Sequence, residues 1–476
     1  MKKTIVVPIL KYHKILLLFV LILVLLLCPL IEAAGTPVKY LPGFGPLPFE
    51  FETGYVGLGE SEEVQLFYYF FKSESNPEVD PLILWITGGP GCGALNAITT
   101  ELGPVLLDAK EYDGSLPTLS LNPYSYTKVA NIIFLDSPVT GGFSYATTKE
   151  ANHSDNVQMA LHTHQFVQKW LVDHSEYLSN DFYVAGDSYS GISVPIITQV
   201  ISDGNEAGNK PWINLKGYIL GNAVTFRPDE QNYRIPHAHG LALISDELYK
   251  SLESSCGGEY QYIDQTNTHC LQHVQTFNRL VSGIYFEHIL EPICNPVSTK
   301  ARHLSPQRRY LNQKLGQLKN PTMLPGVKCR DEWHLLSEIW VNDETVQEAL
   351  HVRKGTHGIW KQCPNYEKMP FTRTINNTIP FHASLSKKGY RSLIYSGDYD
   401  LYVPFLSTQA WIRSLNYSID TEWRRWFVDG QVAGYVTTYS NQMTFTTIKG
   451  AGHTAPEYKP AECLAMLKRW IYYQPL

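Results

Sequence analysis

The chain has 476 residues, 44% of them hydrophobic, and a formal net charge of −6 at pH 7. It is longer than one simple core usually requires, yet neither a repeat nor a low-complexity linker divides it, which favours one large domain with an insertion. The acidic balance excludes a basic nucleic-acid-binding face. The sequence contains no cluster with zinc-ligand spacing, so we expect neither a metal nor another cofactor.

The amino terminus has the pattern of an export signal. An apolar run at 15–27 is followed by small residues at 33–35 and preceded by four lysines: Lys2, Lys3, Lys11 and Lys14. This predicts a signal peptide over residues 1–34 and entry into the secretory pathway, ending in the extracellular space or the vacuole. The alternative, an uncleaved anchor, is disfavoured because the apolar stretch 15–31 is short for a membrane span. No stable membrane association is expected after cleavage.

Residues 182–197 have the pattern of a strand, a sharp turn and a helix, with Gly-Asp-Ser-Tyr-Ser-Gly at 186–191. Such a turn lifts the hydroxyl of Ser188 clear of the sheet and directs the backbone N–H of Tyr189 at a developing oxyanion. The motif departs from its usual form, because Ser190 stands where a glycine is common. We therefore expect a nucleophilic serine at position 188.

A nucleophilic serine needs a histidine base and a carboxylate that orients the base. Two strand-like runs, at 393–395 and 445–448, each end in a glycine-containing loop. The first loop leads to Asp400 and the second to His453, which matches the chain order Ser, Asp, His expected for this fold. Asp398 in the same loop is better suited to stabilising the turn. The predicted triad is therefore Ser188, Asp400 and His453.

A glycine-rich loop at 87–93 follows the apolar run 82–86. Glycines allow a backbone to approach a substrate closely, so the N–H of Gly89 is expected to complete the oxyanion hole with that of Tyr189. A glycine-rich turn without chemistry is the alternative.

Strand-like runs alternate with helical stretches as far as residue 222, and the alternation resumes at 392. This pattern predicts an α/β fold with core segments 35–222 and 346–476. Between them, residues 223–345 form a mainly helical, cysteine-bearing segment, which we interpret as a cap over the site. Its basic portion, 300–328, is expected to be a loop, either excised or intact.

Seven cysteines remain once Cys28 leaves with the signal peptide, and an oxidising lumen favours disulfides, although the sequence leaves their pairing open. Cys463 lies on the apolar side of the last predicted helix, so a buried free thiol is expected there. Three sequons, at Asn152, Asn376 and Asn416, predict N-glycosylation.

Several blocks in one order, at 85–92, 134–138, 142–145, 186–191, 221–222, 396–400 and 450–456, resemble plant serine carboxypeptidase-like proteins of peptidase family S10. The resemblance runs from about residue 38 to the C-terminus and implies an α/β-hydrolase fold with the cap described above. It also implies three disulfides: Cys92–Cys363, Cys256–Cys270 and Cys294–Cys329. Residues 231–249 resemble the branch that contains acyltransferases using glucose esters.

In carboxypeptidases of this family, two acidic groups share a proton and bind the terminal carboxylate of the peptide. The matching residues here are Asp187 and Glu101, with Trp85 and Thr87 as further substrate-binding positions. Two close carboxyls cannot easily both ionise, so one pKa should rise and peptide binding should favour acidic pH. The peptidases typically have Glu at position 187 and Asn at position 87.

These differences favour an acyltransferase of secondary metabolism. It would transfer acyl groups from a 1-O-acyl-β-D-glucose to an alcohol or amine acceptor. A carboxypeptidase that removes C-terminal residues from peptides at acidic pH is the alternative. Gly93 and Thr140-Gly141 also depart from the family pattern, which leaves a catalytically weakened secreted binding protein as a third hypothesis. A lectin-like or structural wall protein would not need the three triad residues together. The sequence does not indicate an oligomeric state.

Overall fold

The computed structural model describes residues 35–108, 112–293, 330–365 and 368–476. The predicted signal peptide, the loop 300–328 and the implied pair Cys294–Cys329 lie outside the described residues. Within the described ranges, no helix is both long and apolar enough to cross a membrane.

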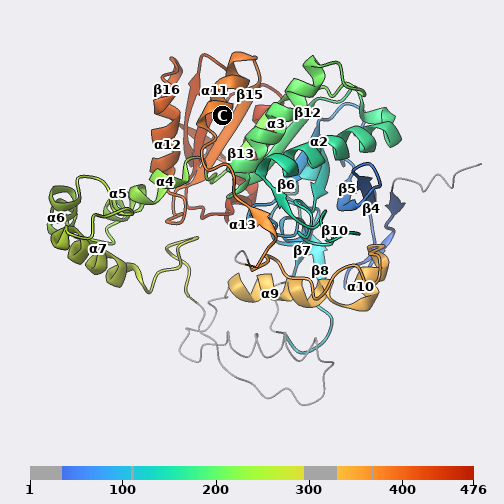
Figure 1. The fold of residues 1–476 in the computed structure, drawn as a ribbon, viewed down its shortest axis with the longest axis horizontal. Helices are drawn as coiled ribbons and strands as arrows, with labels where there is room; N and C mark the ends of the chain where they lie inside the picture. Colours follow the sequence, from blue (N-terminus) through green and yellow to red (C-terminus); the bar gives the residue numbers. More distant parts are fainter. Residues whose placement is uncertain (1–34, 109–111, 294–329, 366–367) are drawn as a thin grey trace, which may run out of the picture.

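A 12-stranded mixed sheet forms the centre of the molecule (Figure 1). Six neighbouring strands in its middle are parallel, in the order β9 (Asn131–Leu135), β6 (Leu82–Ile86), β12 (Phe182–Asp187), β13 (Leu215–Gly221), β15 (Arg391–Gly397) and β18 (Met443–Ile448). Antiparallel strands extend both sides: β5 (Val64–Phe71), β4 (Phe51–Leu58), β1 (Thr36–Pro37) and β10 (Tyr145–Ala146) beyond β9, and β17 (Gln431–Tyr439) and β16 (Ile419–Val428) beyond β18. The parallel strands share one carboxyl edge, where α/β proteins place ligand sites.

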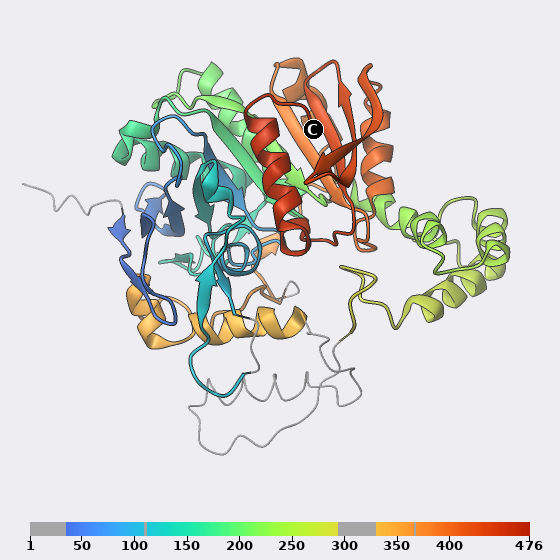
Figure 2. The same cartoon turned by 180° about the vertical axis from the view of Figure 1, so that it is seen from behind.

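Helices cover both faces of the sheet, so the central strands are continuous apolar runs. Ile83 and Trp85 of β6 belong to one core cluster, and Leu84 and Ile86 belong to the other, as the alternation of a strand requires. Figure 1 shows α2 (Asn156–Asp173), α3 (Ser190–Glu206), α11 (Ile379–Lys387) and α12 (Phe405–Ser414) on the near face. The red helix in Figure 2 is α14 (Pro460–Ile471), which packs on the opposite face.

Short elements complete the body. They are β2 (Tyr40–Leu41), β3 (Gly45–Pro46), η1 (Ala97–Glu101), β7 (Val105–Leu107), β8 (Leu119–Leu121), η2 (Tyr126–Lys128), β11 (Ser154–Asp155), η3 (Ser175–Tyr177), β14 (Phe371–Thr372) and α13 (Ala455–Tyr458). Each of the pairs β2–β3, β7–β8 and β11–β14 forms a small sheet.

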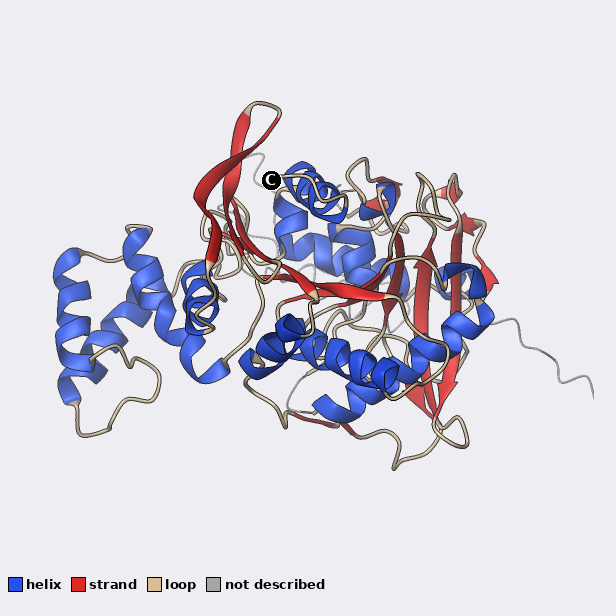
Figure 3. Cartoon of the chain, turned by 90° about the horizontal axis from the view of Figure 1, so that it is seen from above, coloured by secondary structure: helices blue, strands red, loops and turns tan. Residues whose placement is uncertain are grey.

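A largely helical segment connects β13 to β15. Before β14 and α11, its described elements are α4 (Arg227–Glu230), η4 (Gln231–Tyr233), α5 (Arg234–Gly240), α6 (Asp246–Cys256), α7 (Thr268–Val281), α9 (Arg330–Val341) and α10 (Glu344–Ala349). Helices α6 and α7 project from the body, as Figure 3 shows at the left, and pack in a small core with residues of α5 and with Leu401. Helix α10 crosses the predicted boundary at 345; the division of the chain into core and cap segments stays a prediction.

Candidate active site

Ser188 lies at the apex of the turn between β12 and α3, with a φ of +54°. A non-glycine residue is strained in this left-handed region, and such strain is typical of functional turns. A Cβ on Gly186 would lie 2.3 Å from the carbonyl oxygen of Ile86, so only glycine fits there. The hydroxyl of Ser190 donates to that same carbonyl at 2.7 Å, which explains how a serine replaces the usual glycine of the motif.

The three predicted triad residues form one hydrogen-bonded chain. Ser188 Oγ lies 2.8 Å from His453 Nε2, and His453 Nδ1 lies 2.7 Å from Asp400 Oδ2. In this geometry a neutral imidazole protonated at Nδ1 donates to Asp400 and accepts the serine hydroxyl proton at Nε2. Asp398 points elsewhere, because its carboxylate accepts the N–H of Gly450 at 2.6 Å. Of the two candidate aspartates, the structure therefore brings Asp400 to the histidine.

Asp400 is fully buried and is held by donors on two sides. The side-chain amide of Asn222 donates to Oδ2 at 2.9 Å, while the backbone N–H groups of Tyr402 and Val403 donate to Oδ1 at 2.7 and 3.2 Å. Asn222 Oδ1 in turn accepts the N–H of Gly397 at 3.0 Å. Sequence reasoning did not single out Asn222 as a site residue, although its place directly after β13 is a signal that could have found it.

Negative charges surround the imidazole of His453. Burial lowers its pKa, but the charge of Asp400 and the hydrogen bond to it, with further contributions from Glu287 and Asp187, raise the pKa to about 9. The site therefore stabilises the imidazolium that forms when the serine proton is transferred.

The loop after β6 packs directly against the nucleophile. A Cβ on Gly88 would lie 2.7 Å from Ser188 Cβ and 3.0 Å from the backbone nitrogen of Tyr189, so this position requires glycine. Gly89 follows with a φ of +118°, a conformation that L side chains rarely adopt. The N–H groups of Gly89 and Tyr189 thus belong to segments that meet beside Ser188, which is consistent with the predicted oxyanion hole.

One of the two departures from the family pattern, Gly93, has a local structural explanation, and nothing in the structure explains the other, Thr140. A Cβ on Gly93 would lie 2.5 Å from the indole of Trp360, and its N–H donates to the carbonyl of Gln362 at 2.7 Å. Any larger side chain at position 93 would collide with this indole. Thr140 has a φ of +76°, so this threonine occupies a conformation that favours glycine.

Two buried carboxyl groups lie near the nucleophile. Asp187 Oδ1 accepts the N–H of Gly88 at 3.2 Å, and Glu101 Oε1 accepts the amide of Asn96 at 3.4 Å. Burial, followed by the charge of Asp187, raises the pKa of Glu101 well above its usual range. Burial also raises the pKa of Asp187 to about 6, although the charge of His453 opposes this. Near neutral pH the two carboxyl groups together therefore carry at most one negative charge.

Within the described part of the chain, the buried polar atoms beside these groups that have no hydrogen-bond partner include Trp85 Nε1, Thr87 Oγ1, Asn96 Oδ1 and Glu101 Oε2. Buried polar atoms are usually paired, so unpaired ones near a nucleophile are candidates for substrate contacts.

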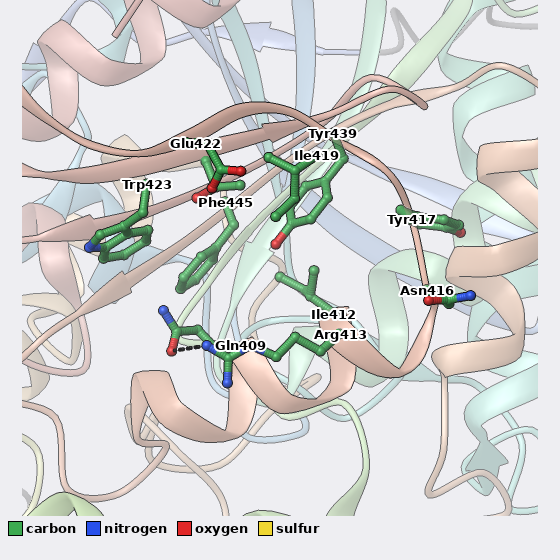
Figure 4. Close-up of a pocket in the computed structure, with 11 residues that line it drawn as sticks. Gln409, Ile412, Arg413, Asn416, Tyr417, Ile419, Glu422, Trp423, Tyr439 and Phe445 are labelled. Atoms are coloured by element: carbon green, nitrogen blue, oxygen red, sulfur yellow. Dashed lines mark hydrogen bonds between the residues drawn. The ribbon is translucent and has the colours of Figure 1, made fainter.

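A separate pocket of about 560 Å³ lies between α12 and strands β16–β18 (Figure 4). Its lining includes Trp423, Tyr439 and Phe445 but none of the triad residues. The chemistry is therefore assigned to the carboxyl edge of the sheet rather than to this pocket.

Comparison with known proteins agrees with this geometry. The serine carboxypeptidase family profile matches residues 42–473. The chain belongs to the serine carboxypeptidase family. Among its relatives in Arabidopsis thaliana, serine carboxypeptidase-like 12 is 49% identical over 92% of this chain and 94% of its own, and serine carboxypeptidase-like 19 is 50% identical over 93% and 95%. A prohormone-processing carboxypeptidase from Saccharomyces cerevisiae superimposes with a TM-score of 0.70 at 19% identity, covering 93% of this chain and 96% of that one.

The α/β-hydrolase fold and the assignment as a serine carboxypeptidase-like enzyme are confirmed by these findings. Disulfides join Cys92 to Cys363 and Cys256 to Cys270, the pairs that the resemblance implied, and Cys463 is buried and free. The side chains of the sequons at Asn376 and Asn416 are exposed, and that of Asn152 is half-buried. Glycosylation at all three stays a prediction.

Proposed function

We propose that this serine carboxypeptidase-like enzyme transfers acyl groups through an acyl-Ser188 intermediate, from 1-O-acyl-β-D-glucose esters to an alcohol or amine acceptor. The observation that carries the covalent route is the hydrogen-bonded chain from Ser188 through His453 to Asp400. We place the enzyme in the secretory pathway, extracellular or vacuolar, where its disulfides would persist.

The first half-reaction acylates the serine. His453 Nε2 takes the hydroxyl proton as Ser188 Oγ attacks the ester carbonyl, and the N–H groups of Gly89 and Tyr189 stabilise the oxyanion. The bond between the carbonyl carbon and the glucose oxygen then breaks, and His453 returns the proton to the departing glucose. In the second half-reaction, the acceptor gives its proton to His453, attacks the acyl-Ser188 ester and regenerates the free serine.

Two neighbouring residues favour a sugar ester over a peptide carboxylate. Thr87 offers one hydroxyl where an asparagine amide would supply two donors, and the short Asp187 is engaged by the N–H of Gly88. Glucose hydroxyls, which both donate and accept, match the unpaired oxygens of Thr87 and Glu101. The terminal carboxylate of a peptide can only accept hydrogen bonds, so it would form fewer hydrogen bonds with these two oxygens.

One observation favours the second candidate, an acid-active carboxypeptidase. The raised pKa values of Glu101 and Asp187 mean that both groups can be protonated in mildly acidic solution, and protonated carboxyls donate to a carboxylate. The partner would then be the C-terminus of a peptide.

The purified protein should be offered a panel of 1-O-acylglucoses with alcohol and amine acceptors and, separately, blocked dipeptides. We expect acyl transfer that is absent in Ser188→Ala, and we expect Thr87→Asn with Asp187→Glu to shift the balance towards peptide hydrolysis. Removal of C-terminal residues with no reaction of any glucose ester would contradict the proposal. Failure of folded protein to react with a fluorophosphonate would instead favour a secreted binding protein.

A further inference from the structure

An irregular segment at residues 286–291, which we call the strap, bridges the two loops that carry Asp400 and His453. The N–H groups of Leu401 and Tyr402 donate to the carbonyl of Phe286 at 2.8 and 3.1 Å. The N–H of His453 itself donates to the carbonyl of Glu287 at 2.7 Å. The base and its orienting acid are therefore both fixed to a segment that follows α7, outside the sheet.

The strap is held in place by a half-buried cation. Arg330, the first residue of α9, contacts Glu291 Oε1 of the strap at 2.8 Å and Glu457 Oε1 of α13 at 2.9 Å. Its guanidinium also lies 4.1 Å from the ring centroid of Tyr458. Because Glu457 lies four residues after His453, one arginine joins the strap to the catalytic loop.

The positive charge of Arg330 compensates the negative charge of Glu457, whose carboxylate has no access to solvent. The side chain of Glu457 is fully buried; it accepts a bond from Thr454 Oγ1 at 2.7 Å and lies 3.2 Å from His334 Nε2. Burial raises the pKa of Glu457, but the charges and hydrogen bonds of His334 and Arg330 lower it to about 2. Removing one partner of such a buried pair leaves an uncompensated charge.

The charge of Glu457 reaches Glu101, one member of the acid pair formed by Glu101 and Asp187. It raises the pKa of Glu101, as do Asp187 and, more weakly, Glu287. A second contact connects α9 to the same place, since Ser337 Oγ lies 3.3 Å from Thr99 Oγ1 on η1, the helix that carries Glu101.

We propose that Arg330 is a positioning residue for the reaction: it ties the strap to the His453 loop and balances the buried charge beside Glu101 and Asp187. The inference deepens the proposed acyl transfer and rests on it only for the choice of substrate. The charged and titratable groups that face this cluster are Glu101, Asp187, Glu287, His288, Glu291, Arg330, His334, His453, Glu457 and Tyr458.

The test compares Arg330→Met with the wild type by two assays. The rate of fluorophosphonate labelling reports the reactivity of Ser188 without any natural substrate, and kcat and KM are measured on whichever ester or peptide is turned over. We expect labelling and kcat to fall roughly tenfold to a hundredfold, the cost of misplacing a catalytic group by about 1 Å, with little change in KM. Labelled wild type with no turnover of any substrate would contradict the proposed function but leave this inference testable.

The pH dependence separates positioning from mere loss of stability. Because it removes the charge of the arginine, Arg330→Met should move the limb of the pH profile that reports the acid pair to higher pH. Glu457→Gln, which removes a negative charge, should move the same limb to lower pH. Glu291→Gln removes only the ion pair between Arg330 and the strap, so it should slow labelling without moving the limb. Arg330→Lys keeps the positive charge, so the limb should stay at its wild-type pH.

Lys388→Met is the matched control, because Lys388 also bridges two carboxylates, Asp203 and Glu206, but on the outer surface of α3 and α11. It should label at the wild-type rate. The inference is overturned if Arg330→Met labels like this control, or if its losses follow the melting temperature alone with no shift of the pH limb.

Discussion

Gly452 offers a direct test of how closely the strap and the catalytic histidine are coupled. A Cβ at this position would lie 2.2 Å from the carbonyl oxygen of Glu287 and 2.8 Å from His288 Cβ. Real Cβ atoms essentially never come closer than 3.0 Å, so in Gly452→Ala the two segments must separate by about 0.8 Å. Because His453 is the next residue and donates its N–H to that carbonyl, the imidazole must move with the loop.

A displacement of this size lengthens the contact of 2.8 Å between His453 Nε2 and Ser188 Oγ beyond hydrogen-bond range. Misplacement by about 1 Å costs roughly 10²-fold in kcat, equivalent to about 2.7 kcal/mol of transition-state stabilisation. The assay is the rate of fluorophosphonate labelling, with circular dichroism to verify the fold. Gly283→Ala is the control, since no atom lies within 4 Å of its added Cβ. Equal labelling rates in the two variants would refute the reasoning.

Three further predictions concern the site. Ser188→Ala, His453→Ala and the double variant should lose activity by similar amounts, on the order of 10⁶-fold, and additive losses would contradict a shared mechanism. Reduction or replacement of Cys92–Cys363 should lower the free energy of unfolding by about 2–5 kcal/mol in denaturant titrations; an unchanged value would show that the bond adds no stability. The pKa of Asp187 is raised to about 6, so its protonated form is lost as the pH rises through 6. Any binding of peptide carboxylates should weaken over that range, while binding of uncharged glucose esters should not. If the inhibition constants of the two ligand classes follow parallel pH profiles, Asp187 does not control carboxylate binding.

The parts of the site that lie at strand ends could be predicted from the sequence. The turn at Ser188 and the loops to Asp400 and His453 each follow an apolar run, and parallel strands bring their carboxyl ends to one edge. The burial of Cys463 followed in the same way from helical periodicity, and the structure confirms it.

The support around the triad could not be predicted, because it depends on contacts between distant segments. The strap has no periodic pattern, and it contacts the catalytic loops through its backbone, which carries no sequence signal. Arg330 is an ordinary basic residue until α9 places it between Glu291 and Glu457. The need for glycine at position 93 likewise becomes visible only when Trp360 packs against it.

The projecting pair α6–α7 has a consequence for protein engineering. These helices are joined by Cys256–Cys270 and pack through residues such as Leu252 and Phe277 in a cluster that includes Leu401, whereas the strap carries backbone bonds to both catalytic loops. The pair is thus inserted ahead of the strap and meets the loop of Asp400 through the apolar contact with Leu401. Homologous hairpins of different length or surface could be exchanged between α5 and residue 284 to alter what approaches the site, provided that the side chains packed on Leu401 are kept so that the geometry of the triad is retained.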